Sequence, residues 1–88
     1  MELEWDEAKR QWTWDNREFD FADLANIDFA SLVTEHDNRY HYGEARFSSF
    51  AYLGDVLINF CWTPRGHRIR VISMRKANDR ERKKYEAR

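Results

Sequence analysis

The start of the chain places its apolar residues at short intervals that are typical of helices. The segment LEW predicts a short strand or an extended lead-in. Asp6 is a typical helix cap, and Trp5, Ala8 and Trp12 then recur at helical spacing. We therefore expect a helix that runs to about Asp15 and buries its tryptophans.

The next segment, FDFADLANI, predicts a second and shorter helix. Asp20 is its expected cap, and Phe21, Leu24 and Ala25 form its apolar face. We expect Phe21 and Leu24 to contribute to the core.

Beyond Phe29 the apolar residues recur at every second position, which is typical of strands. One strand is predicted in FASLVTE, and the polar segment HDNRYHYGE ends it. Further strands are predicted in ARFSSFAYL, VLINFCWT and HRIRVISMR, with turns at GD and PRG. Asn78 and Glu81 then resemble a capping box that opens the basic helix DRERKKYEAR.

These elements predict an α+β fold in which the order along the chain is simple. Two N-terminal helices precede an antiparallel meander of three to four strands, and a basic helix follows. A chain of 88 residues predicts a single domain over residues 1–88. The longest uncharged stretch, VLINFCWTP, is too short to span a bilayer. Cys61 has no second cysteine to pair with, which suits a reducing compartment. Taken together, these observations lead us to expect a small soluble protein of the cytoplasm, with no membrane partner.

Charge is unevenly distributed along the chain. Residues 1–37 hold eleven acids and three bases, whereas residues 38–88 hold five acids and twelve bases. This asymmetry indicates a polyanion or an oppositely charged protein as a partner. The alternative is that the charges are mixed in space and serve only as solvated surface.

The last predicted strand carries several of the cations on one face. Strand alternation places Ile69, Val71 and Ser73 together, and Arg68, Arg70, Ile72 and Met74 on the other side. We expect five cations to line one concave patch beside the basic helix: Arg65, Arg68, Arg70, Arg75 and Lys76. Arginine forks suit phosphate oxygens, so the patch indicates a phosphate backbone.

Several segments resemble the BrnT family of type II toxins over nearly the whole chain. They are LEWDEAKR, FDFADL, TEHDNRYHYGEARF, WTPRG and, most specifically, RIRVISMRKANDRERKKYE. The resemblance implies a RelE-like ribonuclease that cuts RNA without a metal or other cofactor and arrests translation. It also implies a BrnA-like ribbon-helix-helix antitoxin in a heterotetramer, with DNA bound only through that antitoxin.

One element departs from the pattern of the family. Where BrnT proteins usually carry Lys-His-Gly after the first helix, this chain has Asn16, Arg17 and Glu18. Glu18 then has to take the left-handed conformation in which glycine would end the helix, and it is less suited to that conformation than glycine. If the Lys or His assists chemistry, that group is missing here.

Metal-free RNA cleavage needs cations to stabilise the phosphorane and groups to move protons. For charge stabilisation the candidates are Arg75, Lys76, Arg65 and Arg70, and the alternative for each is a surface cation. For proton transfer they are His67, Tyr85 and Glu44. The alternatives are that His67 is a surface residue, that Tyr85 fastens its helix to the sheet, and that Glu44 pairs with Arg39 or Arg46.

Other sites are less well supported. The group His36, Asp37, His41 and Glu44 matches no compact zinc pattern, so no metal site is expected. Trp62 and Tyr52 either pack in the core or stack on RNA. Two functions remain open: an endoribonuclease toxin, and a non-catalytic module that docks its antitoxin and acts mainly in regulating its operon.

Overall fold

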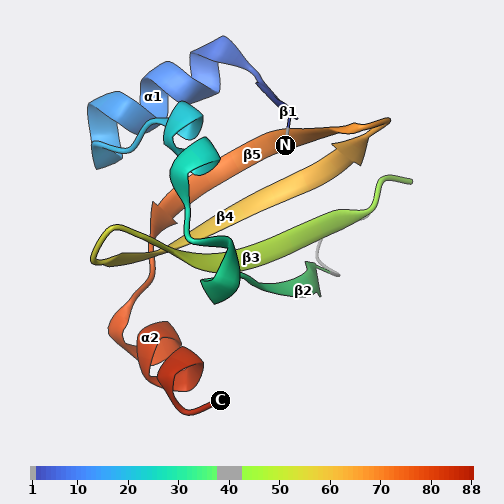
Figure 1. Cartoon of the computed structure of the whole chain (residues 1–88). Coiled ribbons are helices and arrows are strands. Elements are labelled where there is room, and N and C mark those ends of the chain that lie inside the picture. The colour runs from blue at the N-terminus through green and yellow to red at the C-terminus, as the bar shows by residue number, and fades with distance from the viewer. Residues whose placement is uncertain (1, 38–42) are drawn as a thin grey trace.

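A mixed sheet forms the centre of the computed structural model, which describes residues 2–37 and 43–88 (Figure 1). Its five strands lie in the order β1-β5-β4-β3-β2. The elements along the chain are β1 (Glu2–Trp5), α1 (Glu7–Arg17), the 3-10 helices η1 (Phe21–Asn26) and η2 (Phe29–Ser31), β2 (Val33–Asp37), β3 (Arg46–Leu53), β4 (Val56–Arg65), β5 (Arg68–Lys76) and α2 (Asp79–Glu86).

The antiparallel meander is confirmed, but the expected number of strands is too small. Strands β2 to β5 pair in sequence order, each antiparallel to the next. The segment LEW adds a fifth strand, because β1 pairs with β5 in parallel and places Leu3 opposite Ile69. The two ends of the chain's sheet-forming region therefore meet at one edge.

The expectation of two N-terminal helices is also wrong. The described residues before β2 form one α-helix, and the second helical segment is the 3-10 helix η1. Asp20 does cap η1, since its carboxylate accepts the N–H of Ala22 at 2.9 Å. Three residues per turn bring Phe21 and Leu24 to the same side, and both are fully buried.

Helix α1 begins at its predicted cap but buries a different face from the expected one. Asp6 accepts the N–H of Ala8 at 2.9 Å. Trp12, expected in the core, is 52% exposed, whereas Thr13 is buried. Polar residues can face inward because they are satisfied there: Thr13 donates to the carbonyl of Lys9 at 2.8 Å, and Arg17 donates to the carbonyl of Met74 at 3.1 Å.

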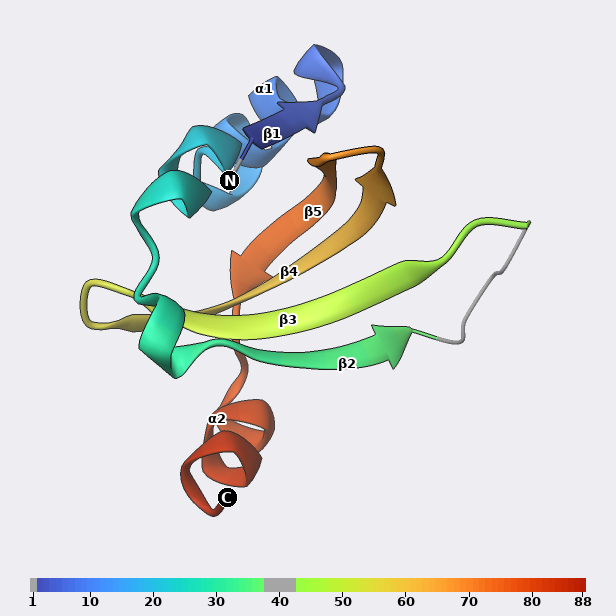
Figure 2. The ribbon, with the colours of Figure 1, turned by 45° about the vertical axis from the view of Figure 1, so that its right-hand side comes forward.

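The core lies between the sheet and the N-terminal helices. Phe21 and Leu24 of η1 pack there with Ile58, Phe60 and Met74 of the central strands. Figure 2 shows α1 and η1 above the strands and α2 below them. The sheet therefore has a core face, covered by α1 and η1, and an open face, toward which α2 turns.

An irregularity in β5 decides which of its residues point to the open face. The register shifts at Cys61 and Trp62, so that Trp62 lies opposite Val71 while Phe60 lies opposite Met74. Val71 and Met74 consequently share the core face, and both are buried. The expectation that Met74 shares a face with Arg70 is therefore wrong.

Helix α2 is held by a few specific contacts. The predicted capping box is present, because Asn78 accepts the N–H of Glu81 at 2.8 Å and Glu81 accepts that of Asn78 at 3.0 Å. Tyr85 donates its hydroxyl to the carbonyl of Ser31, yet none of the residues of α2 is buried. No helix among the described residues is long and apolar enough to cross a membrane.

Candidate functional site

A polar hollow on the open face is the best candidate for a functional site. Strand register places polar side chains of neighbouring strands side by side there, with Ser48 of β3 opposite Cys61 and Asn59 of β4 opposite Arg75. Two adjoining cavities, of about 360 and 350 Å³, lie over this surface. Both are lined by Asp37, Ser48, Asn59 and Arg75, so they form one hollow.

Asn59 fixes the floor of the hollow. Its side chain is almost wholly buried, and its amide donates to Ser48 Oγ at 2.9 Å and to the carbonyl of Ser49 at 3.1 Å. A buried amide without partners would cost about 1–3 kcal/mol. These two bonds hold Asn59 and Ser48 in place, so the hollow has a preorganised polar floor.

Arg75 supplies the positive charge of the hollow. Its Nη1 lies 2.7 Å from Glu81 Oε1, and its Nη2 lies 2.8 Å from Glu81 Oε2. The guanidinium lowers the pKa of Glu81 to about 2, and the carboxylate in turn raises the pKa of Arg75. Arg75 thus stays charged, and it joins β5 to the first turn of α2.

The ion pair with Glu81 uses only some of the N–H donors of the Arg75 guanidinium. A guanidinium has five N–H donors, and those of Arg75 bond Glu81 and, from Nη1 at 3.3 Å, the carbonyl of Lys76. Among the bonds of the described residues, none uses Nε. A phosphate entering the hollow can therefore meet the remaining N–H edge of Arg75.

A second pair of charged residues lies at the other side of the hollow. Asp37 and Arg46 are opposite one another across β2 and β3. Asp37 accepts a weak hydrogen bond from Cys61, with 3.8 Å between Sγ and Oδ2. Within residues 2–37 and 43–88, no three His, Cys, Asp or Glu side chains form a group that could hold a metal ion.

The predicted single patch of cations is wrong, because the structure spreads them along the sheet. Arg68 and Arg75 are separated by about 23 Å along β5, at about 3.3 Å per residue. Three of these cations also have carboxylate partners: Arg65 meets Glu44 at 2.8 Å, Arg70 meets Glu4 at 3.0 Å, and Arg68 meets Glu2 at 3.2 Å.

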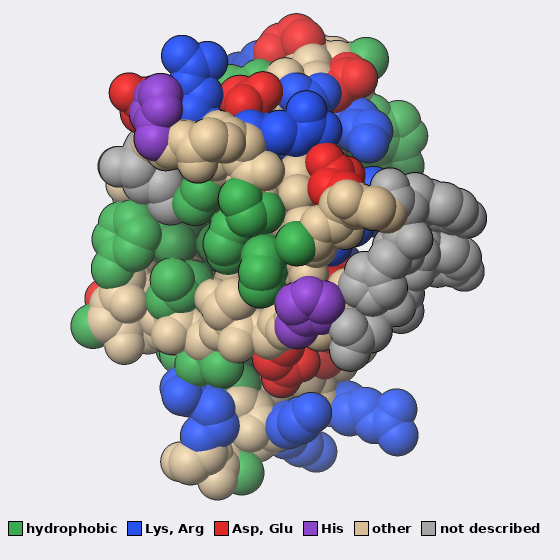
Figure 3. Space-filling model, turned by 90° about the vertical axis from the view of Figure 1, so that its right-hand side faces the viewer, with side chains coloured by type: hydrophobic (Ala, Val, Ile, Leu, Met, Phe, Trp, Pro, Cys, Tyr) green, Lys and Arg blue, Asp and Glu red, His purple; other side chains and the backbone are tan. Residues whose placement is uncertain are grey.

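Parallel pairing of β1 with β5 explains why these charges are mixed in space. Glu2 lies opposite Arg68, and Glu4 lies opposite Arg70. Acids from the start of the chain thus neutralise bases from its end. At that end of the molecule Figure 3 shows Asp, Glu, Lys and Arg interleaved, whereas Lys and Arg gather over α2.

The remaining predicted residues lie outside the hollow. His67 sits exposed in the β4–β5 turn, with Nε2 at 3.0 Å from Glu2. Lys76 is exposed at the end of β5 and lines a different cavity, beside Asp79 and Arg82. Tyr85 donates its hydroxyl to the carbonyl of Ser31 and makes an edge-to-face contact with Tyr52, with 5.8 Å between the ring centroids. These contacts agree with the alternative that Tyr85 fastens its helix to the rest of the fold.

The structure shows how Trp62 packs and which arginines Glu44 pairs with. Trp62 packs against the core, stacks on Phe47 at 4.8 Å and donates to Ser49 Oγ at 2.8 Å. Glu44 pairs with Arg65 and, at 3.8 Å, with Arg46. Arg39 and His41 lie outside the described residues.

The segment Asn16–Glu18 ends α1 with a residue in the left-handed conformation. Glu18 has φ 60° and ψ 29°, and its N–H bonds to the carbonyl of Trp14. Arg17 reaches the carbonyl of Met74 and lies over the Trp12 ring, 4.9 Å from its centroid. Asn16 bonds the carbonyl of Trp12, so the three side chains serve the local structure.

Sequence reasoning missed most of the hollow, although a signal was present. Asn59 interrupts the apolar segment VLINFCWT, and the two serines interrupt ARFSSFAYL. A polar side chain within a strand of otherwise apolar residues is either satisfied by a neighbour or part of a site. Asp37 and Arg46 gave no such signal, since they end strands beside a polar segment.

A scan of protein families matches residues 5–81 to the model of the BrnT ribonuclease toxins of type II toxin–antitoxin systems. The match covers most of the chain, so the protein belongs to this family, and an antitoxin partner follows from that membership. A search of curated proteins found no match.

Proposed function

We propose that this chain is a metal-independent endoribonuclease that cleaves RNA and thereby inhibits translation. The observation that carries the proposal is the hollow on the open face, where the Arg75 cation lies beside the fixed polar side chains of Asn59 and Ser48. Membership of a ribonuclease toxin family supports the same reading.

The proposed reaction is attack of a ribose 2′-OH on its own phosphate. The O2′–P bond forms as the bond from phosphorus to the 5′-oxygen breaks, and solvent water protonates that leaving oxygen. Extra negative charge develops on the phosphoryl oxygens during the step. Arg75 is placed to stabilise that charge, and a donor fixed in advance is usually the largest contribution to such catalysis. Asp37, which lines both halves of the hollow, is our candidate for the base that accepts the 2′-OH proton.

The other candidate residues take different proposed roles. Lys76 follows Arg75 directly and is proposed to bind a neighbouring phosphate. Arg70, Arg65 and His67 lie progressively farther along the sheet and already contact carboxylates, so we propose that they bind the RNA backbone or the antitoxin. Tyr85 is proposed to position α2 rather than to transfer a proton.

The partner that we propose is a BrnA-like ribbon-helix-helix antitoxin in a cytoplasmic heterotetramer. The antitoxin, and not this chain, would contact operator DNA. Covering the hollow or the cations of α2 would block access of RNA and would also stabilise the toxin by mass action.

A non-catalytic module that docks its antitoxin is the second candidate function. It is favoured by the pairing of Arg65, Arg70 and Arg75 with carboxylates, and by the bonds that tie Arg17 to local structure. In this case the chain would bind its antitoxin and regulate its operon without cutting RNA.

The experiment that separates them compares Arg75→Ala with Glu81→Gln in a buffer that contains a chelator. Both variants break the Arg75–Glu81 pair, but only Glu81→Gln keeps the cation. We expect Arg75→Ala to lower the cleavage rate about 10²- to 10³-fold, and Glu81→Gln to retain most of it. Wild-type protein that leaves RNA intact, or equal losses in both variants, would contradict the proposed role.

A further inference from the structure

A second cavity, more apolar than the hollow, lies between α2 and the edge of the open face. Its volume is about 310 Å³, at the lower end of the range of about 300–1,000 Å³ that is typical of ligand sites. Val33 and Phe50 of the sheet line one side, and Tyr85 and Ala87 line the other. We call this cavity the α2 groove.

The α2 groove is continuous with the hollow that holds Arg75. The two cavities share Glu35, Phe50 and Glu81 as lining residues. A ligand that places a phosphate beside Arg75 therefore has its next chemical group at the mouth of the groove. In an RNA chain that group is a ribose with its base.

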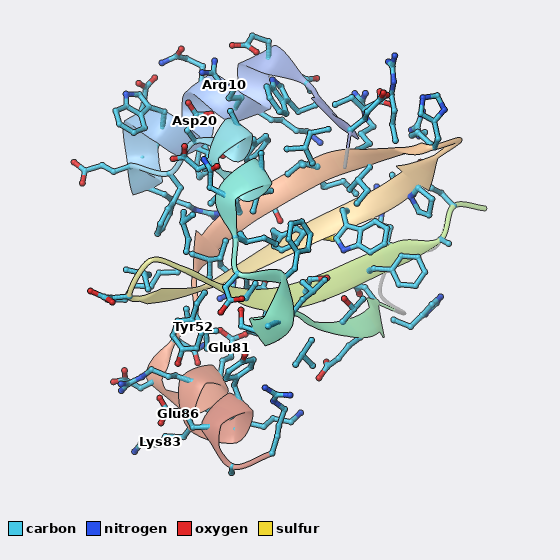
Figure 4. All side chains as sticks on the ribbon, viewed as in Figure 1. Arg10, Asp20, Tyr52, Glu81, Lys83 and Glu86 are labelled. Carbon is cyan, nitrogen blue, oxygen red and sulfur yellow. The ribbon has the colours of Figure 1, made fainter. Side chains whose placement is uncertain are left out.

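The lining of the groove suits a flat aromatic ligand. The ring of Tyr85 is fixed by its hydroxyl bond to Ser31 and by its contact with Tyr52, which points toward α2 in Figure 4. The Arg88 guanidinium, which also lines the groove, lies over one face of that ring, 4.1 Å from its centroid, and offers a planar ligand a flat cation to stack on. A ring held in place by the fold loses little entropy when a ligand stacks on it.

Charge around the groove favours an anionic ligand over an apolar one. Helix α2 and the two residues after it carry five cations and three acids, and one of those acids, Glu81, is already paired with Arg75. Lys84 lines the groove directly. The groove thus combines an apolar, aromatic interior with a basic rim, which is typical of single-stranded nucleic acid sites.

We propose that the α2 groove binds one nucleobase of the RNA, next to the phosphate held at Arg75. This inference rests on the proposed ribonuclease function and names a subsite of it. Glu35, at the boundary of the two cavities, offers only acceptor oxygens when ionised. The groove therefore favours bases that carry an exocyclic amino group, namely adenine, cytosine and guanine, over uracil.

The test uses 2′-O-methyl hexanucleotides of adenine, cytosine or uracil, which lack the attacking hydroxyl and stay intact. Binding to the full chain is measured by calorimetry. We expect the adenine and cytosine probes to bind at least about fivefold more tightly than the uracil probe. Glu35→Gln should reduce that preference, because an amide both donates and accepts.

Two matched pairs of variants locate the binding. Phe50→Leu keeps an apolar side chain but removes the ring, and should weaken binding of the adenine probe about 5- to 100-fold. Phe29→Leu, at a ring that is 54% exposed and does not line the groove, should leave it unchanged. Lys84→Ala should weaken binding more than Lys83→Ala, since Lys83 points away from the sheet in Figure 4. Circular dichroism confirms that each variant is folded.

The failures of the two proposals are distinguishable. If wild-type protein binds the probes with the expected preference but does not cut RNA, only the ribonuclease function is refuted. If Phe50→Leu binds the adenine probe as wild type does, the base subsite is refuted. If Phe50→Leu instead loses only its antitoxin and keeps probe binding, the groove is a protein-docking surface and the proposal is overturned.

Discussion

Arg75 and Glu81 form a two-bonded ion pair, at 2.7 and 2.8 Å, that links the last strand to the first turn of the last helix. The same Glu81 closes the capping box with Asn78. One carboxylate therefore both starts α2 and fastens it beside the hollow. Loss of its charge should weaken both the start of α2 and its attachment to β5.

The charge of Glu81 should make stability depend on acid. Folding lowers the pKa of Glu81 from 4.5 to about 2, because Arg75 favours the ionised form. The contribution to stability is therefore complete above about pH 4.5 and is lost as the pH falls toward 2. In urea titrations across this range, Glu81→Gln should lose less stability than wild type does.

The control for that experiment is Glu86→Gln, on the exposed side of the same helix. It should follow the wild-type curve. If Glu81→Gln and wild type lose stability in parallel below pH 4.5, the ion pair does not contribute as the structure indicates.

Glu18→Gly should stabilise the protein. Glu18 is a non-glycine residue with φ 60°, in the left-handed region that a Cβ atom disfavours. Glycine removes this strain, so we expect a gain of about 1 kcal/mol and a rise in Tm of about 4–8 °C. Thermal unfolding followed by circular dichroism measures the change, and Glu18→Ala, which keeps the Cβ, should show no such gain.

The Arg10–Asp20 pair should hold α1 against η1. Arg10 Nε and Nη2 lie 2.8 and 2.9 Å from the two oxygens of Asp20, and the side chains face one another in Figure 4. Arg10 lowers the pKa of Asp20, and Asp20 raises that of Arg10. Asp20→Asn keeps a capping oxygen but removes the charge, so it should cost about 1 kcal/mol or less, and Arg10→Gln should also lower stability because it removes the same ion pair.

A double-mutant cycle tests this pair directly. If the two residues interact, the double variant should be destabilised less than the sum of the two single variants, by at least about 0.5 kcal/mol. Simple additivity in denaturant unfolding would show that the pair contributes nothing to stability.

Ser49 should be sensitive to loss of its hydroxyl. It is fully buried, accepts the indole N–H of Trp62 at 2.8 Å, and shares a bond of the same length with Thr34. Ser49→Ala leaves the Trp62 donor without its partner and should cost about 1–3 kcal/mol. The cost should shrink in a Trp62→Phe background, which has no N–H to satisfy; an unchanged cost would contradict this explanation.

Local signals in the sequence predicted well where the helices begin. Asp6, Asp20 and the pair Asn78 and Glu81 were recognisable because a cap depends on residues only two or three positions apart. The length of η1 was less predictable. Its six residues suit a 3-10 helix as well as an α-helix, and contact with the sheet decides between them.

Features that depend on distant residues were not predictable from the local pattern. The partner of β1 is β5, and nothing within LEW identifies it. The register shift in β5 places Arg75 beside Asn59, on the same face of the sheet. Simple alternation from Arg70 would place Arg75 on the other face. The sequence predicted that Arg75 lies among other cations, whereas the structure surrounds it with Asn59, Ser48 and Asp37.

Pairing of the first strand with the last has a consequence for synthesis. A ribosome makes β1 early, but β1 cannot take its place until β5, which ends at Lys76, has also been made. A nascent chain that has not yet reached β5 thus lacks both the closed sheet and Arg75. The candidate site around Arg75 is therefore completed only after the strand that closes the sheet has been made.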